Sequence, residues 1–385
     1  MEVHPLRIAY CDGVDLARVA PSDVAALAGH ADRTVSVLLG FTPRERPWLQ
    51  DENLRGHTTH AGYSLAGAVA DRRLKYLPVR LSAVPRLLAD VMRPDVVVVS
   101  GVRRGSDLAF AGDVGWGPAA VRHAGAVVVE VSAGAPDYGG PMIGGNVVAV
   151  IEAPVDEPAP TFRAPDDIDM AIGRHVVSIL PNEPTIQLGP GGVPDAIVAS
   201  LDRSVHVWSG VVTDAVGQLV ERGLLLGEVT TAYTWGGAPI EELHRRGRLR
   251  LVSVEETHDI SALSAIPRFV GLNTALQLGI DGSVNVERVG GRVITGIGGH
   301  ADFCLGASRS VGGLSIVAVR STTKSGASTI VANVDVVSTP HSDVEMVVTE
   351  HGIADLRGLD DAERALRIIE VAAPEHRAAL RAAIV

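Results

Sequence analysis

The chain has 385 residues, and its 45 acidic against 34 basic side chains give a formal net charge of −11 at pH 7. Apolar residues make up 46% and charged residues 21%, which is typical of a soluble globular protein and excludes a low-complexity disordered chain. The acidic balance argues against nucleic-acid binding, because such a surface needs clustered Lys and Arg. The two cysteines, Cys11 and Cys304, exclude a disulfide framework and a cysteine-rich metal site.

The length predicts more than one hydrophobic core, so we expect two domains, residues 1–180 and 181–385. No uncharged apolar run reaches the roughly 18 to 20 residues of a membrane span, and the N-terminus has no signal-peptide layout. These features predict a cytoplasmic protein whose partners include neither a membrane nor a nucleic acid.

Helices and buried strands alternate along the chain. A helix is expected over 21–28 with Ser22 as its N-cap. Four β-branched runs predict buried strands: 34–39, 96–99, 126–131 and 315–319. The alternation favours an α/β protein with two open, mostly parallel sheets and a site in the cleft between them. The proline-rich, acidic segment 152–168 predicts an exposed connection or an extended edge segment.

A glycine turn follows a predicted strand in residues 185–197, where Gly189, Gly191 and Gly192 precede a helix start. Backbone N–H groups at such a turn can approach a phosphate or a carbonyl closely, and a helix N-terminus favours negative charge. The segment lacks the Gly-Lys-Ser/Thr of a Walker loop and the G-x-G-x-x-G of a dinucleotide site. A plain strand-to-helix turn is an equally good interpretation of the local sequence.

A second glycine-rich segment spans residues 290–303. Consecutive amides at Gly298, Gly299 and His300 are suited to an oxyanion hole. The alternative is a strained β-turn that a buried Asp302 holds in place. We favour the functional interpretation, because the segment holds more glycines than one turn requires.

Histidines offer candidates for proton transfer. His57 and His60 have i, i+3 spacing but no carboxylate or cysteine at ligand spacing, so no metal site is expected. No Gly-x-Ser-x-Gly motif supports a serine hydrolase. Four other histidines are candidate acids or bases, although a satisfied polar histidine is the usual role of each: His206, His258, His300 and His351.

Long motifs of the C-terminal half occur in a fixed order. They are residues 271–276 (Gly-Leu-Asn-Thr-Ala-Leu), 282–287 (Gly-Ser-Val-Asn-Val-Glu), 296–303 (Gly-Ile-Gly-Gly-His-Ala-Asp-Phe), 321–324 (Ser-Thr-Thr-Lys) and 349–358 (Thr-Glu-His-Gly-Ile-Ala-Asp-Leu-Arg-Gly). With weaker N-terminal matches, these motifs resemble the acetyl-CoA hydrolase/transferase family. That family includes 4-hydroxybutyrate, succinate:acetate and butyrate:acetate CoA-transferases.

The resemblance implies two CoA-transferase-type α/β domains, usually in a homodimer, with an acyl-CoA and a small acceptor as substrates and no tightly bound cofactor or metal. It implies ping-pong chemistry in which a glutamate attacks the thioester, and it assigns the oxyanion N–H to Gly299. Coenzyme A contacts are then expected at the glycine turn of 185–197, at Gly298 and in the motif of 321–324, where they fall on Ser321, Thr323 and Lys324. A solvated surface position is an almost equal interpretation of Lys324.

One departure from the family concerns its nucleophile, a glutamate in a motif that resembles His-Ser/Thr-Glu-Met-x-x-Asp-Gly. When the chain is anchored on Asp214 and Gly223, this glutamate position becomes Gly210, which has no carboxylate. A glutamyl-CoA intermediate is then not expected, and room for an acceptor is expected beside Gly210. Ser209, Gly210 and Asn273 are expected to line this substrate pocket.

Two further departures from the family motifs offer candidate general bases. His300 follows the glycine pair where many relatives carry Gln or Ser, and His258 lies near an active-site Asn of relatives, with Glu256 close in sequence. An imidazole serves as a general base near neutral pH. We therefore expect direct attack on the thioester by water or a small hydroxyl or amine, assisted by His300 or by His258 with Glu256.

Two alternatives stay open. A conventional carboxylate CoA-transferase would use another glutamate as nucleophile: Glu221, Glu228, Glu255 or, most credibly, Glu256. A non-catalytic CoA-ester binder, or a scaffold adapted to other chemistry, would bind acyl-CoA without turning it over.

Overall fold

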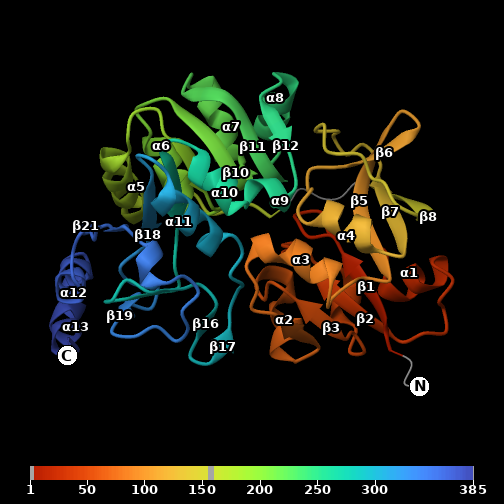
Figure 1. Ribbon diagram of the computed structural model, residues 1–385, viewed down its shortest axis with the longest axis horizontal. Coiled ribbons are helices and arrows are strands. Elements are labelled where there is room, and N and C mark those ends of the chain that lie inside the picture. The colour runs from red at the N-terminus through yellow and green to blue at the C-terminus, as the bar shows by residue number, and fades with distance from the viewer. Residues whose placement is uncertain (1–3, 155–159, 385) are drawn as a thin grey trace. The chain divides into compact units, whose positions relative to one another are not determined.

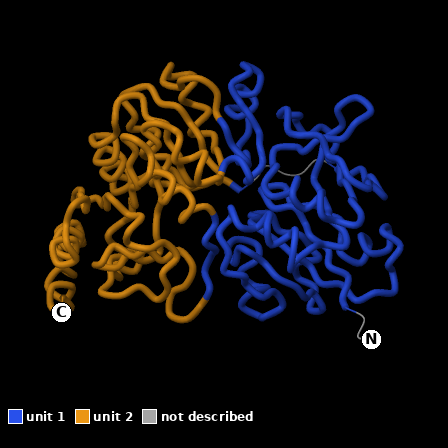
Figure 2. Tube along the Cα trace, in the orientation of Figure 1, with its two compact units in different colours: residues 1–160, 230–257, 293–298 blue, residues 161–229, 258–292, 299–385 orange. Residues whose placement is uncertain are grey.

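The computed structural model describes residues 4–154 and 160–384 and contains two compact units (Figures 1 and 2). Unit 1 comprises residues 1–160, 230–257 and 293–298, and unit 2 comprises residues 161–229, 258–292 and 299–385. The chain therefore passes from one unit to the other several times. A domain boundary at residue 180 stays a prediction, and residues 155–159 of the expected connection lie outside the described residues.

Unit 1 is built on a sheet with the strand order β4-β3-β2-β1-β5-β7-β8. Neighbours on this path pair in parallel, while β6 pairs antiparallel with β5. The strands expected at 34–39, 96–99 and 126–131 are confirmed as β2, β5 and β7. The strand bounds are Leu6–Tyr10 (β1), Val35–Leu39 (β2), Gly56–Thr58 (β3), Leu74–Tyr76 (β4), Val96–Arg104 (β5), Asp107–Phe110 (β6), Ala126–Ser132 (β7) and Val147–Ala153 (β8).

The β-branched runs form strands in the interior of this sheet, and both faces of these strands are buried. The valines of β5 from Val96 to Val99 are at most 1% exposed, which explains their unbroken apolar sequence. Helices of unit 1 are α1 (Pro21–Leu27), α2 (Ala66–Ala70), α3 (Val84–Ala89), α4 (Gly117–His123), α8 (Ala238–Arg245) and α9 (Val254–Thr257), with the short strand β12 (Leu249–Leu251).

The N-cap expected at Ser22 is wrong. Helix α1 begins at Pro21 after an extended Ala20, because proline lacks an N–H and its fixed φ suits the first helical position. At the other end of the sheet, β8 includes Glu152 and Ala153, so the start of segment 152–168 is an extended edge strand.

Unit 2 holds a second sheet in which β10, β9, β13, β18, β20 and β21 follow one another. The pairs from β10 to β20 are parallel, and β21 is antiparallel to β20. The strand expected at 315–319 is confirmed as β18, one residue earlier. The bounds are Thr185–Leu188 (β9), Val205–Thr213 (β10), Phe269–Asn273 (β13), Leu314–Ala318 (β18), Met346–Thr349 (β20) and Gly352–Asp355 (β21); β11 (Leu225–Trp235) passes from unit 2 into unit 1 at Thr230.

Two groups of helices pack on the sheet of unit 2. Helix α5 (Asp167–Ile179) packs against α6 (Gly192–Ser200), which also contacts α7 (Asp214–Glu221). Helix α10 (Ile260–Ala265) packs against α11 (His300–Arg309), and α11 lies on β13 and β18. Smaller elements follow: β14 (Gln277–Gly279), β15 (Val284–Asn285), β16 (Arg288–Val289), β17 (Arg292–Val293), β19 (Ile330–Val331), α12 (Asp361–Glu370) and α13 (Arg377–Ala382).

Candidate active site

The chain order of the second sheet reverses between β9 and β13. From β9 the chain continues through α6 to β10 on one side, whereas β13 leads through α11 to β18 on the other. The carboxyl ends of β9 and β13, at Leu188 and Asn273, flank this point. In open parallel sheets ligands bind at such a position, because the connecting loops diverge there.

The glycine turn after β9 has the predicted order of strand, turn and helix. Gly191 is the N-cap of α6 and has a φ of +129°, a backbone conformation that is strained for any residue with a side chain. A Cβ atom at Gly192 would lie 2.9 Å from the Oδ2 atom of Asp169, so this position has no room for a side chain. Gly189 and Gly191 have open space where a Cβ would point. Coenzyme A binding at this turn stays a prediction.

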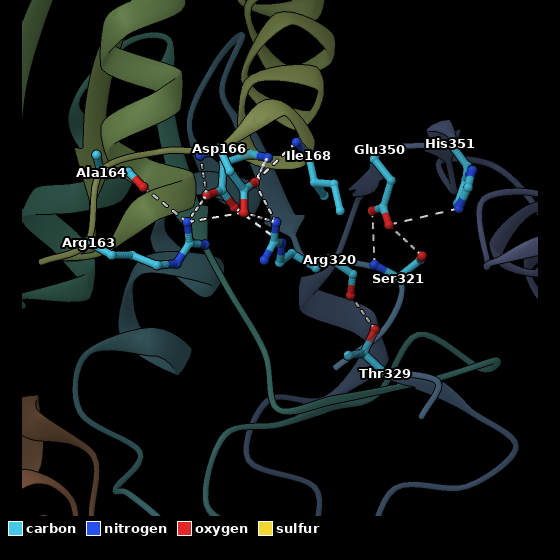
Figure 3. A network of polar contacts seen from close by, with 10 residues as sticks. Arg163, Ala164, Asp166, Ile168, Arg320, Ser321, Thr329, Glu350 and His351 are labelled. Carbon is cyan, nitrogen blue, oxygen red and sulfur yellow. Dashed lines mark hydrogen bonds and ion pairs between the residues drawn. The ribbon is translucent and has the colours of Figure 1, made fainter. Parts of the chain in front are cut away.

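An ion-pair network joins Arg163 and Arg320 to the N-terminus of α5 (Figure 3). The carboxylate of Asp169 is fully buried and pairs with Arg163 at 2.6 Å and with Arg320 at 3.4 Å. Arg320 also binds Asp166, the N-cap of α5, at 2.5 Å. A Cβ atom at Gly192 would lie 3.0 Å from the guanidinium of Arg163, so the network lies against the start of α6.

The motif of residues 321–324 divides into a buried and an exposed part. Ser321 is buried and donates its N–H and hydroxyl to Glu350, at 2.9 and 2.6 Å. Thr323 and Lys324 are exposed on a turn that the N–H of Thr323 closes on Ala327 at 2.8 Å. Of this motif, Thr323 and Lys324 are therefore exposed, and Thr322 is half-buried.

His258 lies against two glycines of unit 2. A Cβ atom at Gly210 would stand 3.0 Å from Cε1 and 3.1 Å from Nε2 of His258, and one at Gly299 would stand 2.4 Å from Nε2. The imidazole also packs against Phe303, with ring centroids 4.6 Å apart. The room expected beside Gly210 is therefore not empty, because the His258 ring fills it.

Burial sets the protonation of His258. The residue is 1% exposed, and desolvation lowers its pKa to about 3, so the imidazole is neutral at pH 7. A Cβ atom at Gly299 would displace this ring, whereas one at Gly210 would need the ring to shift by a few tenths of an ångström. The structure thus brings together Gly210, His258 and Gly299.

His300 is the first residue of α11, directly after its N-cap Gly299. Its Nδ1 atom lies 2.8 Å from the hydroxyl of Thr339, and its buried Nε2 atom has no hydrogen-bond partner. Burial lowers the pKa of His300 to about 4, and the nearby backbone of Thr274 opposes this only in part. A second neutral imidazole therefore flanks Gly299.

Other predicted site residues have different surroundings. The hydroxyl of buried Ser209 lies 2.7 Å from the carbonyl of Leu188 and joins β10 to β9. Asn273, at the end of β13, donates to the Cys304 sulfur at 3.6 Å. Glu256 belongs to unit 1 and pairs with Arg250 at 2.7 Å, and Gly298 also belongs to unit 1.

Two residues that contact the candidate bases were not singled out from the sequence. Phe303 holds the His258 ring and Thr339 binds His300. Phe303 ends the motif of residues 296–303, so that motif carried a signal but not the contact, whereas Thr339 lies outside the motifs given above. Among residues 4–154 and 160–384, no group of three His, Cys, Asp or Glu side chains is arranged to hold a metal ion. Within the same ranges, no helix combines the length and apolar character of a membrane span.

Comparison with known proteins gives one family match. Residues 239–384 match the family described as acetyl-CoA hydrolase/transferase C-terminal domain, which confirms the C-terminal resemblance. The chain is 27% identical over 355 residues to a 4-hydroxybutyrate coenzyme A transferase of Clostridium kluyveri, covering 86% of this chain and 82% of that protein. It is 24% identical to an acetyl-CoA hydrolase of Eremothecium gossypii, covering 95% and 83% of the two chains.

Solved structures share the fold. RipA from Yersinia pestis superposes with a TM-score of 0.86 at 23% identity, covering 99% of this chain and 94% of that one. A 4-hydroxybutyrate CoA-transferase from Porphyromonas gingivalis gives a TM-score of 0.74 at 24% identity, covering 98% and 93%. The expected α/β fold with two mostly parallel sheets is thus confirmed.

Proposed function

Because residues 239–384 match the acetyl-CoA hydrolase/transferase C-terminal domain family, we propose that the chain is an acyl-CoA-dependent enzyme. The printed names of the relatives, CoA transferase and acetyl-CoA hydrolase, support this general class. The finer proposal is that the acyl group passes from the thioester directly to water or to a small hydroxyl or amine, without a glutamyl-CoA intermediate. The small acceptor, the homodimer and the cytoplasmic location stay predictions.

One observation carries this proposal: the imidazole of His258 occupies the space of a side chain at Gly210 and borders Gly299. The family's glutamate falls on Gly210 in the alignment above, so an imidazole stands where that carboxylate would project. Gly299 caps the ten-residue helix α11, whose first amides lack partners within the helix. These N–H groups and the helix dipole stabilise an oxyanion at the thioester carbonyl.

His258 then acts as the general base. Its low pKa keeps the imidazole neutral at neutral pH, so one of its two ring nitrogens bears no proton. So weak a base accepts the acceptor's proton only as negative charge develops on the thioester oxygen, because that charge stabilises the imidazolium. The acceptor oxygen or nitrogen bonds to the carbonyl carbon, the carbon–sulfur bond breaks, and the proton passes to the departing CoA thiolate.

The alternative nucleophiles have other contacts. Glu255 pairs with Arg122 at 2.5 Å and Glu256 pairs with Arg250 at 2.7 Å. Glu221 and Glu228 are exposed on the surface of the chain.

The test measures CoA release from acetyl-CoA, with and without hydroxylamine or glycerol as acceptor, in the wild type and in His258→Gln and His300→Gln. We expect His258→Gln to lower kcat by about 100- to 10,000-fold, the usual contribution of a general base. A comparable loss in His300→Gln alone would assign the proton transfer to His300 instead.

His123→Gln is the matched control, because His123 ends α4 in unit 1 and belongs to neither the glycine nor the histidine cluster. We expect its CoA release to equal that of the wild type. Tight binding of acyl-CoA without any CoA release by the wild type would overturn the catalytic proposal in favour of a CoA-ester binder.

A further inference from the structure

His300 holds a polar atom that the proposed chemistry does not use. The side chain is 8% exposed, and its Nε2 atom has no hydrogen-bond partner among residues 4–154 and 160–384. The backbone of Thr274 lies near the ring but completes no hydrogen bond with Nε2. Because an unpaired buried polar atom costs stability, its presence in a folded protein needs an explanation.

The other ring nitrogen of His300 has two partners, and all three residues belong to unit 2. Nδ1 lies 2.8 Å from the hydroxyl oxygen of Thr339 and 3.6 Å from the sulfur of Cys304. Cys304 is four residues further along α11, about one helical turn away. Which ring nitrogen carries the proton depends on whether these two partners donate to Nδ1 or accept from it.

The thiol of Cys304 favours one of the two tautomers. The side chain of Asn273 donates to the sulfur at 3.6 Å. Burial raises the pKa of Cys304 to about 12, so its S–H is present at pH 7 and can donate in turn to Nδ1. The hydroxyl of Thr339 rotates to donate to the same nitrogen. In the other tautomer the S–H would face an N–H, so this arrangement favours a lone pair on Nδ1 and the proton on Nε2.

A neutral His300 with this tautomer is a hydrogen-bond donor. Burial lowers its pKa to about 4, so the ring is neutral at pH 7. Its one lone pair is already engaged at Nδ1, and its Nε2–H group is free to donate. Neutral imidazoles at helix N-termini polarise substrate carbonyl groups in this way in other enzymes. The role of general base is then left to His258.

The free N–H group lies at the amino end of α11. His300 is the first residue of this helix and directly follows the N-cap Gly299. The two nitrogens project from different sides of an imidazole, so Nε2 faces away from Cys304 and Thr339. In the proposed function the thioester oxygen accepts from the first amides of the same helix. The ring therefore extends from one of the residues whose amides meet that oxygen.

We infer that the Nε2–H group of His300 donates a hydrogen bond to the thioester carbonyl oxygen and to the oxyanion that forms from it. This inference rests on the proposed acyl-CoA function. It divides the work between the two buried imidazoles, because His258 takes the acceptor's proton while His300 stabilises the negative charge. A hydrogen bond to developing charge is stronger in the transition state than in the bound substrate, so this contact raises kcat.

The first experiment compares kcat for CoA release from acetyl-CoA in His300→Leu and His300→Gln. Leucine removes the N–H group, whereas the amide of glutamine keeps an N–H donor. We expect His300→Leu to lower kcat by about 100- to 1,000-fold, the usual effect of one oxyanion donor, and His300→Gln to keep most of the rate. Equal losses in both variants, or no loss in His300→Leu, would overturn the inference. The matched control is His123→Leu, in α4 of unit 1, which should equal the wild type.

Infrared spectroscopy tests the hydrogen bond itself. The His258→Gln variant slows turnover and keeps His300, so acetyl-CoA with a ¹³C-labelled thioester carbonyl can be observed while bound. We expect the labelled C=O stretch to move to lower frequency on binding, and this shift to shrink in the double variant His258→Gln, His300→Leu. The same shift in both proteins would overturn the inference.

The tautomer is measured in the wild type, which removes any dependence on how a variant folds. Two-bond ¹H–¹⁵N correlations of the His300 ring should show the proton on Nε2 and the lone pair on Nδ1. A proton on Nδ1 would overturn the inference and leave the proposed function intact. Failure of the wild type to bind acetyl-CoA would overturn the proposed function, and this inference with it.

Discussion

The imidazole of His258 lies where a side chain at Gly210 would project: a Cβ atom there would stand 3.0 Å from Cε1 and 3.1 Å from Nε2 of the ring. A Cβ atom at Gly299 would stand 2.4 Å from Nε2 of the same ring. A histidine enclosed by two glycines has little freedom to move. A methyl group added at either glycine should therefore disturb the imidazole, and the loss of stability should differ between Gly210 and Gly299.

We predict that Gly299→Ala is more damaging than Gly210→Ala. A methyl group at Gly299 overlaps both His258 at 2.4 Å and Phe303 at 2.7 Å, whereas one at Gly210 needs shifts of a few tenths of an ångström. Overpacking of this kind costs about 1–3 kcal/mol, so we expect that loss of unfolding free energy at Gly299 and less than about 1 kcal/mol at Gly210. Urea denaturation of the two variants checks this order; equal losses would contradict the contact geometry.

A carboxylate at position 210 should regain the family's covalent chemistry only if the histidine is removed. Gly210→Glu alone introduces a side chain into space that His258 fills. The double variant Gly210→Glu, His258→Ala vacates that space, so we expect a glutamyl-CoA adduct by intact mass only in the double variant. An adduct in neither protein would contradict the alignment of Gly210 with the family's glutamate.

The two buried imidazoles predict that the protein loses stability in acid. Burial lowers the pKa of His258 to about 3 and that of His300 to about 4, below the value of about 6.5 in an unfolded chain. The unfolded state therefore binds more protons below pH 6.5, and the unfolding free energy falls as the pH falls. Each histidine contributes a slope of about 1.4 kcal/mol per pH unit between its two pKa values.

His258→Gln isolates one of these contributions. We expect the slope of unfolding free energy against pH near pH 5 to be smaller by about 1.4 kcal/mol per pH unit than in the wild type. Urea denaturation at several pH values measures both slopes. An unchanged slope would show that His258 keeps its ordinary pKa in the folded protein.

Asp12 predicts the opposite pH dependence in unit 1. The carboxyl group is buried and accepts the Tyr233 hydroxyl at 2.6 Å, and desolvation raises its pKa to about 7. Between pH 4 and 7 the unfolded chain binds fewer protons here, so this group lowers stability as the pH rises. We expect Asp12→Asn to unfold at a higher temperature than the wild type at pH 8, with the difference shrinking toward pH 4.

Both cysteine thiols should be silent in assays of CoA release. Burial raises the pKa of Cys304 to about 12, and burial with the nearby Asp12 raises that of Cys11 well above its usual value. Because only the thiolate reacts, a disulfide reagent at pH 8 should detect no protein thiol in the folded state and two in denaturant. Rapid reaction of the folded protein would contradict these raised pKa values; Cys304 is buried, whereas Cys11 is half-buried.

The sequence predicted the regular part of this protein well. The apolar runs at 96–99 and 126–131 became central strands because both faces of these strands are covered, a condition that an unbroken β-branched run reports directly. The turn at Gly191 was also predicted, since a strand, glycines and a helix start occur there in order. Local signals of this kind depend on neighbours in the chain.

The contacts of the candidate site depend on residues distant in sequence and could not be read from it. Nothing near Gly210 indicates that the His258 ring fills its side-chain space, and the expected vacancy was therefore wrong. Glu256 precedes His258 by two residues yet belongs to the other unit, because the chain leaves unit 1 at Thr257. Such placement is decided by packing after the local elements have formed.

The central claim is that acyl transfer proceeds without a glutamyl-CoA intermediate. The most direct test measures the intact-protein mass after incubation with benzoyl-CoA and acetyl-CoA, with and without borohydride. The account predicts free CoA in solution and an unmodified protein mass at every time point. A CoA-sized adduct, or a borohydride-reduced glutamate located by peptide mapping, would contradict it and restore the conventional transferase mechanism.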